Sequence, residues 1–308
     1  MSFEVVSHES HGGWFEKRFP EEEERNKIID DWLVQKQRCT VGYWLHERLY
    51  QLADFLIKPN TSLLTVGDGY GFDALYFQGK GLEVTATDIA GSFLPLVKKR
   101  KLISDFSVEN AEKMTFSNDN FDYVFCKEAY HHFPRPAMAV YEMLRVAKKG
   151  IIIIEPHDPL SRMPVMLALR NTLDRINPRL LQRYWKNRYS FEEVGNYVFK
   201  LSEREIEKLA MGINLPAVAF KGINNNYYAL SIHQALFEQT VGYNSPVYQK
   251  IKRKMAFHNL LTYLGLMPSQ VLSAIIFKIL PDESTIQALE EQGYIFYKFP
   301  PNPYLKTS

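Results

Sequence analysis

Residues 62–71 read Ser-Leu-Leu-Thr-Val-Gly-Asp-Gly-Tyr-Gly, and an apolar, helix-like run begins directly after them. Three glycines within five positions, Gly67, Gly69 and Gly71, allow a tight turn and a close approach of the backbone to a ligand. Free amides at the start of the following helix favour a carboxylate or phosphate group nearby. The stretch therefore predicts a strand, a ligand-binding turn and a helix, although the glycine spacing alone also fits an ordinary strand-to-helix turn.

An acid at the end of the next expected strand supports the ligand-binding interpretation. Asp88 follows Gly67 by about 20 residues, the position at which an acid accepts hydrogen bonds from ribose hydroxyls in nucleotide-binding sheets. The glycine spacing argues against a dinucleotide. A pyrophosphate fingerprint would place its third glycine at Phe72, whereas Gly71 comes one position early.

The region around the turn has the pattern of an α/β sheet. Between residues 61 and 156 short β-branched or apolar runs alternate with helix-length amphipathic segments. This alternation is typical of parallel strands joined by crossover helices, in a sheet buried on both faces. Residues 135–149 are expected to form such a helix, with Pro136 at its start and Gly150 after its last lysines. The expected strands are residues 62–66, 82–88, 102–108, 121–126 and 150–155.

The rest of the chain is expected to cover and complete this sheet. Residues 1–60 predict an N-terminal helical cover, with one or two helices over 21–57, and residues 61–308 predict one α/β domain. Ser202 and Glu205 form a capping box for a helix to about Met211. The last expected elements are a sixth strand at 217–222, a helix at 283–292 and a seventh strand at 294–299.

Two segments are expected to lie outside the sheet, at about residues 160–200 and 227–281. Both are rich in aromatic and basic residues, and loops beyond the carboxyl edge of such sheets commonly shape the ligand site. We expect these insertions to form a largely helical cap over an acceptor pocket. The aromatic residues assigned to that pocket are Tyr184, Trp185, Tyr189, Tyr197, Tyr243 and Tyr248.

Residues 62–156 resemble the class I S-adenosylmethionine-dependent methyltransferases, particularly the ubiquinone/menaquinone-type group. Four motifs occur in the family's order: the glycine turn, the acid at 88, the segment 108–116, and the strand 121–126 with its loop His131-His132-Phe133. The resemblance implies a Rossmann-like, seven-stranded sheet with helices on both faces and S-adenosylmethionine as the cofactor. Its aminoacyl part would lie at the turn, its ribose at the acid and its adenine at 110–112. The cofactor-binding residues implied are Gly67, Asp68, Gly69, Tyr70, Gly71, Asp88, Asn110, Ala111 and Lys127.

The chain departs from the family pattern at two positions. Thr65 stands where the family usually has an acid, two residues before the first glycine, and Asn110 stands where the family often has Asp. Asn110 can still donate or accept a hydrogen bond toward adenine, but it lacks the carboxylate. Asp68 is an unusual acid inside the turn, and we hypothesise that it replaces the role lost at Thr65.

Candidate catalytic residues follow the fourth and fifth expected strands. Methyl transfer from a sulfonium is a displacement at an activated carbon, so the site mainly has to orient the acceptor and needs a base only for a hydroxyl or a protonated amine. We expect His131 or His132 to take this proton while Glu155 supports the imidazole. The alternative is that the histidines pack beside the cofactor and that Glu155 only accepts backbone amides.

The same edge of the sheet carries residue types that bind metal ions: His131, His132, Glu155, His157 and Asp158. They lack a helical His-x-x-x-His spacing and a second chelating pair, so no metal centre is expected. Tyr70 and Tyr130 either flank the sulfonium through their ring faces or pack as ordinary buried aromatics.

The composition favours a small-molecule acceptor. Lysine and arginine total 37 against 35 acids, a net charge of +2, which gives no reason to expect nucleic acid as a partner. Two cysteines, Cys39 and Cys126, are too few and too scattered for a disulfide framework. The first residues do not resemble a secretory signal, so we expect a cytoplasmic protein.

The longest apolar region, residues 260–280, is interrupted by Pro268 and by polar residues, so it does not predict a membrane span. The basic run Lys250-Ile251-Lys252-Arg253-Lys254 comes shortly before it. A helix lying on a membrane surface and a buried helix are both compatible with this pattern.

The leading hypothesis is S-adenosylmethionine-dependent methylation of an oxygen or nitrogen atom of a small molecule, such as a sugar or another biosynthetic intermediate. The acceptor class rests on the resemblance. Two alternatives are a non-catalytic S-adenosylmethionine-binding protein and a nicotinamide-dependent oxidoreductase, the latter disfavoured by the glycine spacing. The sequence determines neither the acceptor nor the oligomeric state.

Overall fold

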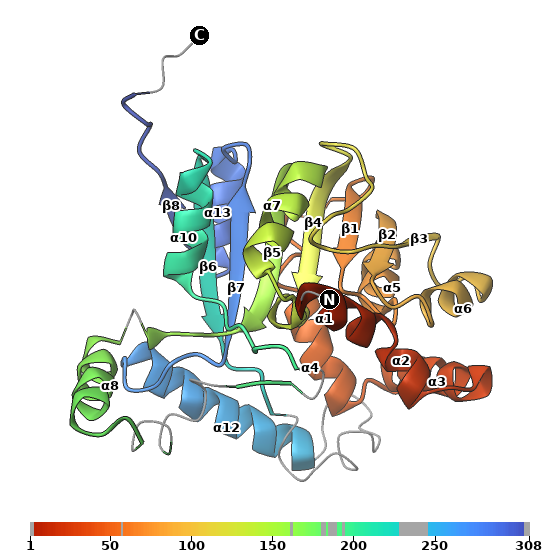
Figure 1. The fold of residues 1–308 in the computed structure, drawn as a ribbon, viewed down its shortest axis with the longest axis horizontal. Helices are drawn as coiled ribbons and strands as arrows, with labels where there is room; N and C mark the ends of the chain where they lie inside the picture. The colour runs from red at the N-terminus through yellow and green to blue at the C-terminus, as the bar shows by residue number, and fades with distance from the viewer. Residues whose placement is uncertain are drawn as a thin grey trace.

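A computed structural model describes residues 3–56, 58–160, 163–179, 183, 190–192, 195–227 and 246–304. Eight strands form one sheet in the order β3-β2-β1-β4-β5-β7-β6-β8 (Figure 1). The strands are β1 Ser62–Val66, β2 Glu83–Asp88, β3 Asp105–Val108, β4 Phe121–Lys127, β5 Ala147–Pro156, β6 Ala217–Ile223, β7 Val271–Phe277 and β8 Ile295–Lys298.

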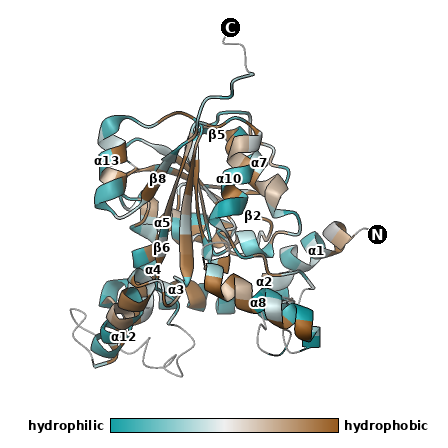
Figure 2. Cartoon of the chain, turned by 90° about the vertical axis from the view of Figure 1, so that its left-hand side faces the viewer, coloured by the Kyte–Doolittle hydropathy of each residue, from teal (hydrophilic) through white to brown (hydrophobic). Residues whose placement is uncertain are grey.

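Helices cover both faces of the sheet (Figure 2). The α-helices are α1 Phe3–Gly12, α2 Trp14–Arg18, α3 Glu22–Arg38, α4 Val41–Tyr50, α5 Phe72–Gln78, α6 Leu94–Lys99, α7 Pro136–Val146, α8 Pro164–Ile176, α10 Glu203–Gly212, α12 Pro246–Tyr263 and α13 Glu283–Glu291. Side chains of β5 alternate between the two layers: Ile151 and Ile153 pack with α7 and α10, whereas Ile152 and Ile154 pack with α4, α5 and α13. The predicted Rossmann-like α/β class is therefore confirmed.

The first five strands of the chain, β1 to β5, are parallel, as the sequence predicts. Strand β1 lies between β2 and β4, and β4 pairs with β5. Because these strands run in the same direction, their carboxyl ends meet at one edge of the sheet, where ligands of such folds bind. Asp88, the loop after Lys127 and Glu155 all lie at this edge.

The sequence predicts seven strands, whereas the sheet has eight, because one strand lies in a segment that was expected to be outside the sheet. The segment 227–281, expected to lie outside the sheet, contributes β7, which pairs antiparallel with both β5 and β6. All seven residues of β7 are buried, so the strand lacks the polar alternation that distinguishes a strand from a buried helix in sequence. The terminal run, expected as the seventh strand, is the edge strand β8 beside β6.

The regions before and after the central strands are helical. Residues 21–57 give α3 and α4, and the Thr40 side chain caps α4 by accepting from the amide of Tyr43 at 3.2 Å. The Ser202 hydroxyl caps α10 by accepting from the amide of Glu205 at 3.3 Å, the cap that the sequence predicts. Helices α1 and α2 precede this region and had no sequence prediction of their own.

Two helices belong to the expected insertions. Helix α8 follows β5, and α12 precedes β7. Among the aromatics assigned to the acceptor pocket, Tyr184, Trp185, Tyr189 and Tyr243 lie outside the described residues. The cap over that pocket therefore stays a prediction. No helix within the described ranges is long and apolar enough to cross a membrane.

The central position of β7 can be tested by removing a buried side chain. We expect Ile275→Ala to lower the free energy of unfolding by about 2–5 kcal/mol, because the cavity left by a buried isoleucine cannot collapse fully. Ile275 is fully buried, whereas Ile279, just beyond β7, is 62% exposed. Denaturant unfolding of Ile279→Ala serves as the control, and an equally small effect for both variants would contradict the placement of β7 in the core.

Candidate functional site

The glycine turn after β1 adopts a backbone that requires glycine at two positions. Gly67 and Gly71 have φ angles of 74° and 73°, in the left-handed region that glycine adopts without strain. A Cβ atom added to Gly67 would lie 2.2 Å from the Cβ of Ala129. The turn is thus packed directly against the loop that follows β4.

Asp68 organises the turn from within. Its carboxylate accepts hydrogen bonds from the amides of Asp73 and Ala74, at 3.2 and 2.8 Å, and from the Thr65 hydroxyl at 3.0 Å. Burial, and then the neighbouring charge of Asp73, raise the pKa of Asp68 well above its usual value. Thr65 and Asp68 are partners here, and the carboxylate is occupied by the start of α5. A direct contact of Asp68 with a cofactor stays a prediction.

Asp88 ends β2 and faces the turn. Its Oδ1 accepts a hydrogen bond from the Ala90 amide at 2.7 Å, while Oδ2 lies 3.1 Å from the point where a Cβ on Gly69 would stand. Burial raises the pKa of Asp88 to about 6. The Oδ2 atom of Asp88 is therefore directed toward Gly69, and a side chain at position 69 would stand between Asp88 and the turn.

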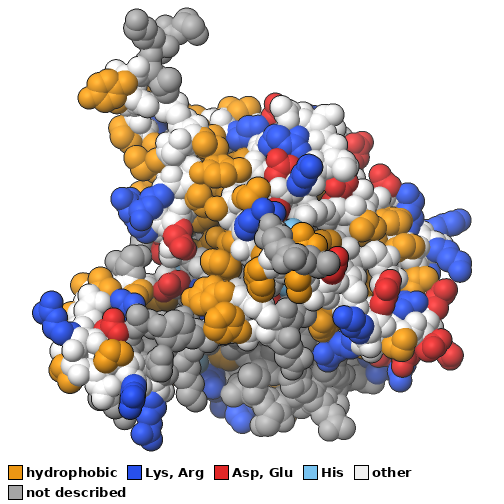
Figure 3. All heavy atoms as spheres, viewed as in Figure 1, with side chains coloured by type: hydrophobic (Ala, Val, Ile, Leu, Met, Phe, Trp, Pro, Cys, Tyr) orange, Lys and Arg blue, Asp and Glu red, His pale blue; other side chains and the backbone are white. Residues whose placement is uncertain are grey.

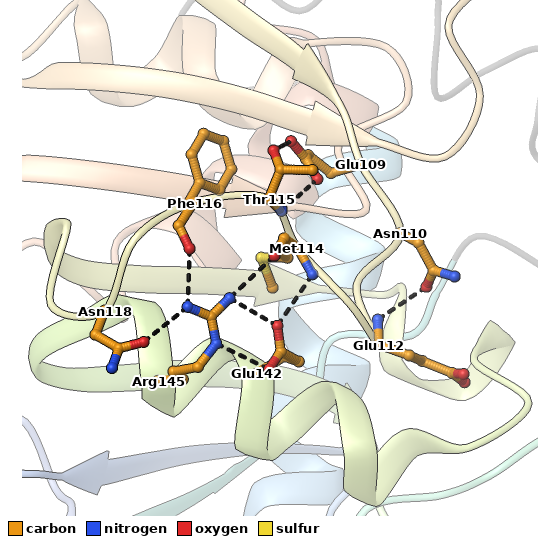
Figure 4. A network of polar contacts seen from close by, with 9 residues as sticks. All are labelled: Glu109, Asn110, Glu112, Met114, Thr115, Phe116, Asn118, Glu142 and Arg145. Atoms are coloured by element: carbon orange, nitrogen blue, oxygen red, sulfur yellow. Dashed lines mark hydrogen bonds and ion pairs between the residues drawn. The ribbon is translucent and has the colours of Figure 1, made fainter.

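The segment that carries Asn110 and Ala111 is held to α7 by a polar network (Figure 4). Arg145 donates to the carbonyls of Met114 and Phe116, at 3.0 and 2.8 Å. The Asn110 Oδ1 accepts from the Glu112 amide at 2.9 Å. These bonds fix the loop after β3 in place, and no sequence pattern marks Arg145 for this role.

Lys127 lies at the end of β4, beside α4 and α5. Its Nζ is 3.5 Å from Asp73 and 3.3 Å from Glu128, and it lies over the ring of Tyr50. Burial raises the pKa of Asp73, an effect that the charge of Lys127 opposes. The structure therefore shows Lys127 balancing the buried carboxylate of Asp73 and the more exposed one of Glu128, and its contact with a cofactor stays a prediction.

Phe15 in α2 occupies the space between the turn and Asp88. A Cβ on Gly69 would lie 2.4 and 2.8 Å from two carbons of the Phe15 ring. The ring also makes edge contacts with Tyr70 and Phe93, with centroids 4.7 and 5.2 Å apart. No periodic pattern in the sequence marks Phe15, because its contacts lie far away along the chain.

Helix α1 extends this cover over the loop after β3. The His8 Nδ1 lies 3.3 Å from the Asn110 amide nitrogen, and the His8 Nε2 lies 3.5 Å from Glu112. The N-terminal helices therefore contact two of the predicted cofactor positions, namely the turn and Asn110.

His131 and Glu155 form a close pair on the acceptor side. The His131 Nδ1 lies 2.6 Å from Glu155 Oε2, while Glu155 Oε1 accepts from the amides of Ala129 and Tyr130 at 2.6 and 2.7 Å. Although burial opposes protonation of the imidazole, the charge and hydrogen bond of Glu155 outweigh it and raise the pKa of His131. The structure thus pairs His131 with Glu155, and the ring of His132 lies beside that of His131, with centroids 4.0 Å apart.

His132, the third candidate, pairs with a residue that the sequence analysis missed. Its Nδ1 lies 2.6 Å from Glu192 Oε1, and its ring is 5.6 Å from that of His11. Burial, followed by the charge of His132, lowers the pKa of His11 to about 4, so this imidazole is neutral near pH 7. Donor atoms of His131, His132 and Glu192 lie within 4.8 Å of one another, a spacing that a metal ion could use. A carboxylate oxygen already lies 2.6 Å from the Nδ1 atom of each imidazole.

His157 and Asp158 have structural partners. The His157 ring bonds to Ser269 at 2.7 Å and to Glu203 at 3.1 Å, both through buried groups. The Asp158 carboxylate accepts from the Leu160 amide at 3.2 Å. These two residues anchor the end of β5, and the structure does not bring them to the histidine pair.

The described part of the chain also contains a cavity away from the glycine turn. It has a volume of about 490 Å³, lies between α4, β6 and α12, and is lined by residues that include Arg48, Lys221, Asn224 and Thr262. The space at the turn is filled instead by Phe15, so we place the candidate site from the geometry of its residues rather than from the size of this cavity.

Comparisons with known proteins agree with this arrangement. Residues 64–154 match the family described as a methyltransferase domain. A demethylmenaquinone methyltransferase from Renibacterium salmoninarum is 24% identical over 183 residues, 58% of this chain and 76% of that protein. A 2-methyl-6-phytyl-1,4-hydroquinone methyltransferase from Synechocystis sp. is 31% identical over 106 residues, 32% of each chain. The crystal structure of the YcgJ protein from Bacillus subtilis has 17% identity and a TM-score of 0.46, covering 75% of this chain and 97% of that chain.

The sheet, the glycine turn and the acid at the end of β2 form the arrangement with which α/β folds bind nucleotide-like cofactors. With the family match, the chain belongs to the class I S-adenosylmethionine-dependent methyltransferases. The residues present fit that cofactor. Asp88 is a half-buried carboxylate whose Oδ2 would lie 3.1 Å from a Cβ on Gly69, and glycine at position 69 keeps the turn free of a side chain there. The nicotinamide oxidoreductase and the non-catalytic binding protein are thereby set aside.

The role of Asp88 predicts a loss of cofactor affinity. We expect Asp88→Ala to weaken S-adenosylmethionine binding by about 1.5–3 kcal/mol, the usual contribution of hydrogen bonds to a charged group. Because the pKa of Asp88 is about 6, wild-type affinity should also decline as the pH falls below that value and the carboxylate gains a proton. Calorimetry across pH measures both the affinity of the variant and the pH dependence of the wild type. Unchanged affinity in the variant would show that Asp88 does not bind the ribose.

The position of Phe15 predicts the opposite effect. A cofactor held between Gly69 and Asp88 requires the ring to move, and a binding-competent state that is only partly populated weakens apparent affinity by that fraction. Phe15→Ala should therefore bind S-adenosylmethionine several-fold more tightly. Phe19→Ala is the matched control, because Phe19 contacts Phe93 from the same segment. Weaker binding by Phe15→Ala would show that the ring packs on the bound cofactor instead.

Proposed function

We propose that the protein methylates an oxygen or nitrogen atom of a small-molecule acceptor, such as a sugar or another biosynthetic intermediate, with His131 as the general base. The observation that carries this proposal is the pairing of His131 with the buried Glu155, at 2.6 Å. Bound S-adenosylmethionine supplies the activated methyl group. The residues of the chain orient the acceptor and accept its proton.

Glu155 acts as a positioning residue. It is fully buried, and two backbone amides fix its carboxylate, so the His131 ring that it contacts has a defined orientation. If Nδ1 donates its proton to Glu155, the lone pair of Nε2 is directed away from the carboxylate and is available to an acceptor hydroxyl. A pair of this kind holds one tautomer of the imidazole.

The environment of His131 also sets a pH requirement. The pKa of His131 is raised above its usual value, and the base must be neutral to accept a proton. Below that pKa the imidazole carries a proton and the reaction slows; as the pH rises through it, the rate increases. The rate should therefore increase with pH over a range that lies above the ordinary histidine pKa of about 6.5.

His132 is the weaker candidate for the base. Its side chain is 41% exposed, and its Nδ1 lies 2.6 Å from Glu192 rather than from a carboxylate fixed by backbone amides. We propose that it belongs to the wall of the acceptor site together with His11. Since the imidazoles of the histidine pair are engaged by carboxylates, we also propose that the reaction proceeds without a metal ion.

A second candidate is methyl transfer to carbon. Two relatives are named for menaquinone and hydroquinone substrates, and a hydroquinone carries a hydroxyl that a base such as His131 could deprotonate. The two candidates differ in the product. Carbon NMR of a product made with a labelled methyl group separates a bond to oxygen or nitrogen from a bond to carbon.

Substitution of His131 gives the direct test. His131→Ala should lower turnover by about 10²–10⁴-fold, the usual contribution of general-base assistance, and leave S-adenosylmethionine affinity nearly unchanged. His132→Ala is the comparison, and we expect it to retain most of the activity. Full turnover by His131→Ala with chemistry rate-limiting, or loss of cofactor binding, would make this histidine structural.

Glu155→Gln tests the positioning role through a pH profile. The amide oxygen can still accept from the amides of Ala129 and Tyr130, but the negative charge beside His131 is lost. The pKa of His131 should fall, and the rising limb of the rate against pH should move to lower pH. A profile that keeps the wild-type midpoint would contradict the coupling between these two residues. Addition of a chelator should leave the wild-type rate unchanged.

A further inference from the structure

Helix α8 exposes an apolar stripe to solvent. Val165, Leu169 and Ile176 are 80%, 55% and 72% exposed, and Ala168 and Thr172 lie on the same side at helical spacing. None of the described residues of α8 is buried. A surface helix ordinarily turns such a stripe toward the core, so the orientation of α8 calls for an external partner.

Helix α12 has a buried side and an exposed side. Ile251 and Met255 pack against Val41 and Leu45 of α4. The opposite side exposes Phe257 and Leu260, and the row continues to Leu264 just beyond the helix. Because residues three and four apart share one side of a helix, these apolar residues lie in a row with two cations. The complete row is Lys250, Arg253, Phe257, Leu260 and Leu264.

The charge around this row has one sign. Lys252 and Lys254 flank it and are exposed, and the sequence from 246 to 281 contains neither Asp nor Glu. Exposed apolar residues between lysines and arginines are typical of helices that lie in the plane of a membrane surface. The same row would be poorly suited to the dry interface with a second protein, where lysine is depleted.

Both helices lie at the same edge of the sheet as the candidate site. Helix α8 follows the carboxyl end of β5, and α12 leads into the start of β7, which pairs with that end of β5 through Pro156 and Val271. Figures 1 and 2 both place α8 and α12 at this end of the molecule. Figure 3 shows apolar and basic side chains together at the lower left, where Figure 1 draws α8.

We propose that α8 and α12 form a docking surface for an anionic lipid membrane. The docking surface consists of the exposed apolar residues of the two helices with the cations of α12: Val165, Leu169, Ile176, Lys250, Lys252, Arg253, Lys254, Phe257, Leu260 and Leu264. The apolar side chains enter the boundary between headgroups and acyl chains, while the cations contact lipid phosphates. Docking in this way turns the edge that carries His131 toward the membrane.

This inference does not depend on the proposed catalytic roles, because membrane binding requires neither cofactor nor acceptor. The test measures co-sedimentation of the full chain with vesicles of phosphatidylcholine containing phosphatidylglycerol, and with vesicles of phosphatidylcholine alone. Binding should be strong only to the anionic vesicles and should weaken as salt is added, since surface electrostatic attraction is screened.

Two double variants separate the charge from the apolar contribution. Each basic residue near an anionic surface strengthens binding about fivefold, so Lys250→Glu with Arg253→Glu should weaken it by at least about 30-fold. Phe257→Ser with Leu260→Ser should weaken binding to the same vesicles while the charge is unchanged. The matched control combines Lys208→Glu on α10 with Ile279→Ser beyond β7, both exposed and away from α8 and α12.

The variants alter exposed positions, so circular dichroism and melting temperature should match the wild type. Absence of wild-type binding to the anionic vesicles would overturn the proposal, as would equal binding by the control and by both double variants. Sedimentation velocity tests the other possible occupant of this surface, a second copy of the chain. A dimer that is lost in Phe257→Ser with Leu260→Ser, in a protein that ignores vesicles, would assign the face to a second copy of the chain.

Discussion

The burial of the Glu155 carboxylate is the constraint on which the acceptor side of this protein depends. A buried carboxylate is costly unless hydrogen bonds and an opposite charge compensate it. Glu155 accepts hydrogen bonds from the amides of Ala129 and Tyr130, and its second oxygen contacts the His131 imidazole. Satisfying this one side chain therefore determines the path of the loop after β4 and the orientation of the histidine.

The same loop joins the acceptor side to the cofactor side. Ala129, whose amide binds Glu155, stands where a side chain on Gly67 would have to lie. A larger residue at position 67 would push the loop away from Glu155, and a loop released from Glu155 would no longer pack on the turn. The glycine is needed here for its small size as much as for its backbone angle.

The N-terminal helices α1 and α2 also contact the residues that are predicted to bind the cofactor. Phe15 lies on Gly69, and His8 lies beside Asn110, so the residues that should hold the cofactor are already in contact with protein. The Phe15 ring, which packs on Tyr70 and Phe93, occupies the space that the cofactor would fill. Cofactor binding and the position of α1 and α2 are in this way linked, since both use the same surface.

The sequence predicted what depends on local patterns. The glycine turn, Asp88 and the candidates His131 and Glu155 all follow strand ends, and parallel strands bring such ends to one edge. Strand β7 was missed because its seven buried residues show no polar alternation, so the run also fits a buried helix. Phe15 and Glu192 were missed because their partners lie far away in the chain, and nothing in their own neighbourhood marks the contact. Asp68 was noticed as an unusual acid, but its role as a cap depends on the amides that point at it.

Helix α8 shows how folding and function are separated in this chain. The central sheet is stabilised by strands whose side chains are buried on both faces, and its order does not require α8. A helix of 13 residues that buries none of them gains little from packing, and isolated helices of this length are only marginally stable in water. The exposed apolar stripe of α8 lowers solubility, and the sheet does not need this stripe in order to fold. A membrane that covers this stripe, as proposed, would stabilise the helix at the edge where the acceptor has to enter.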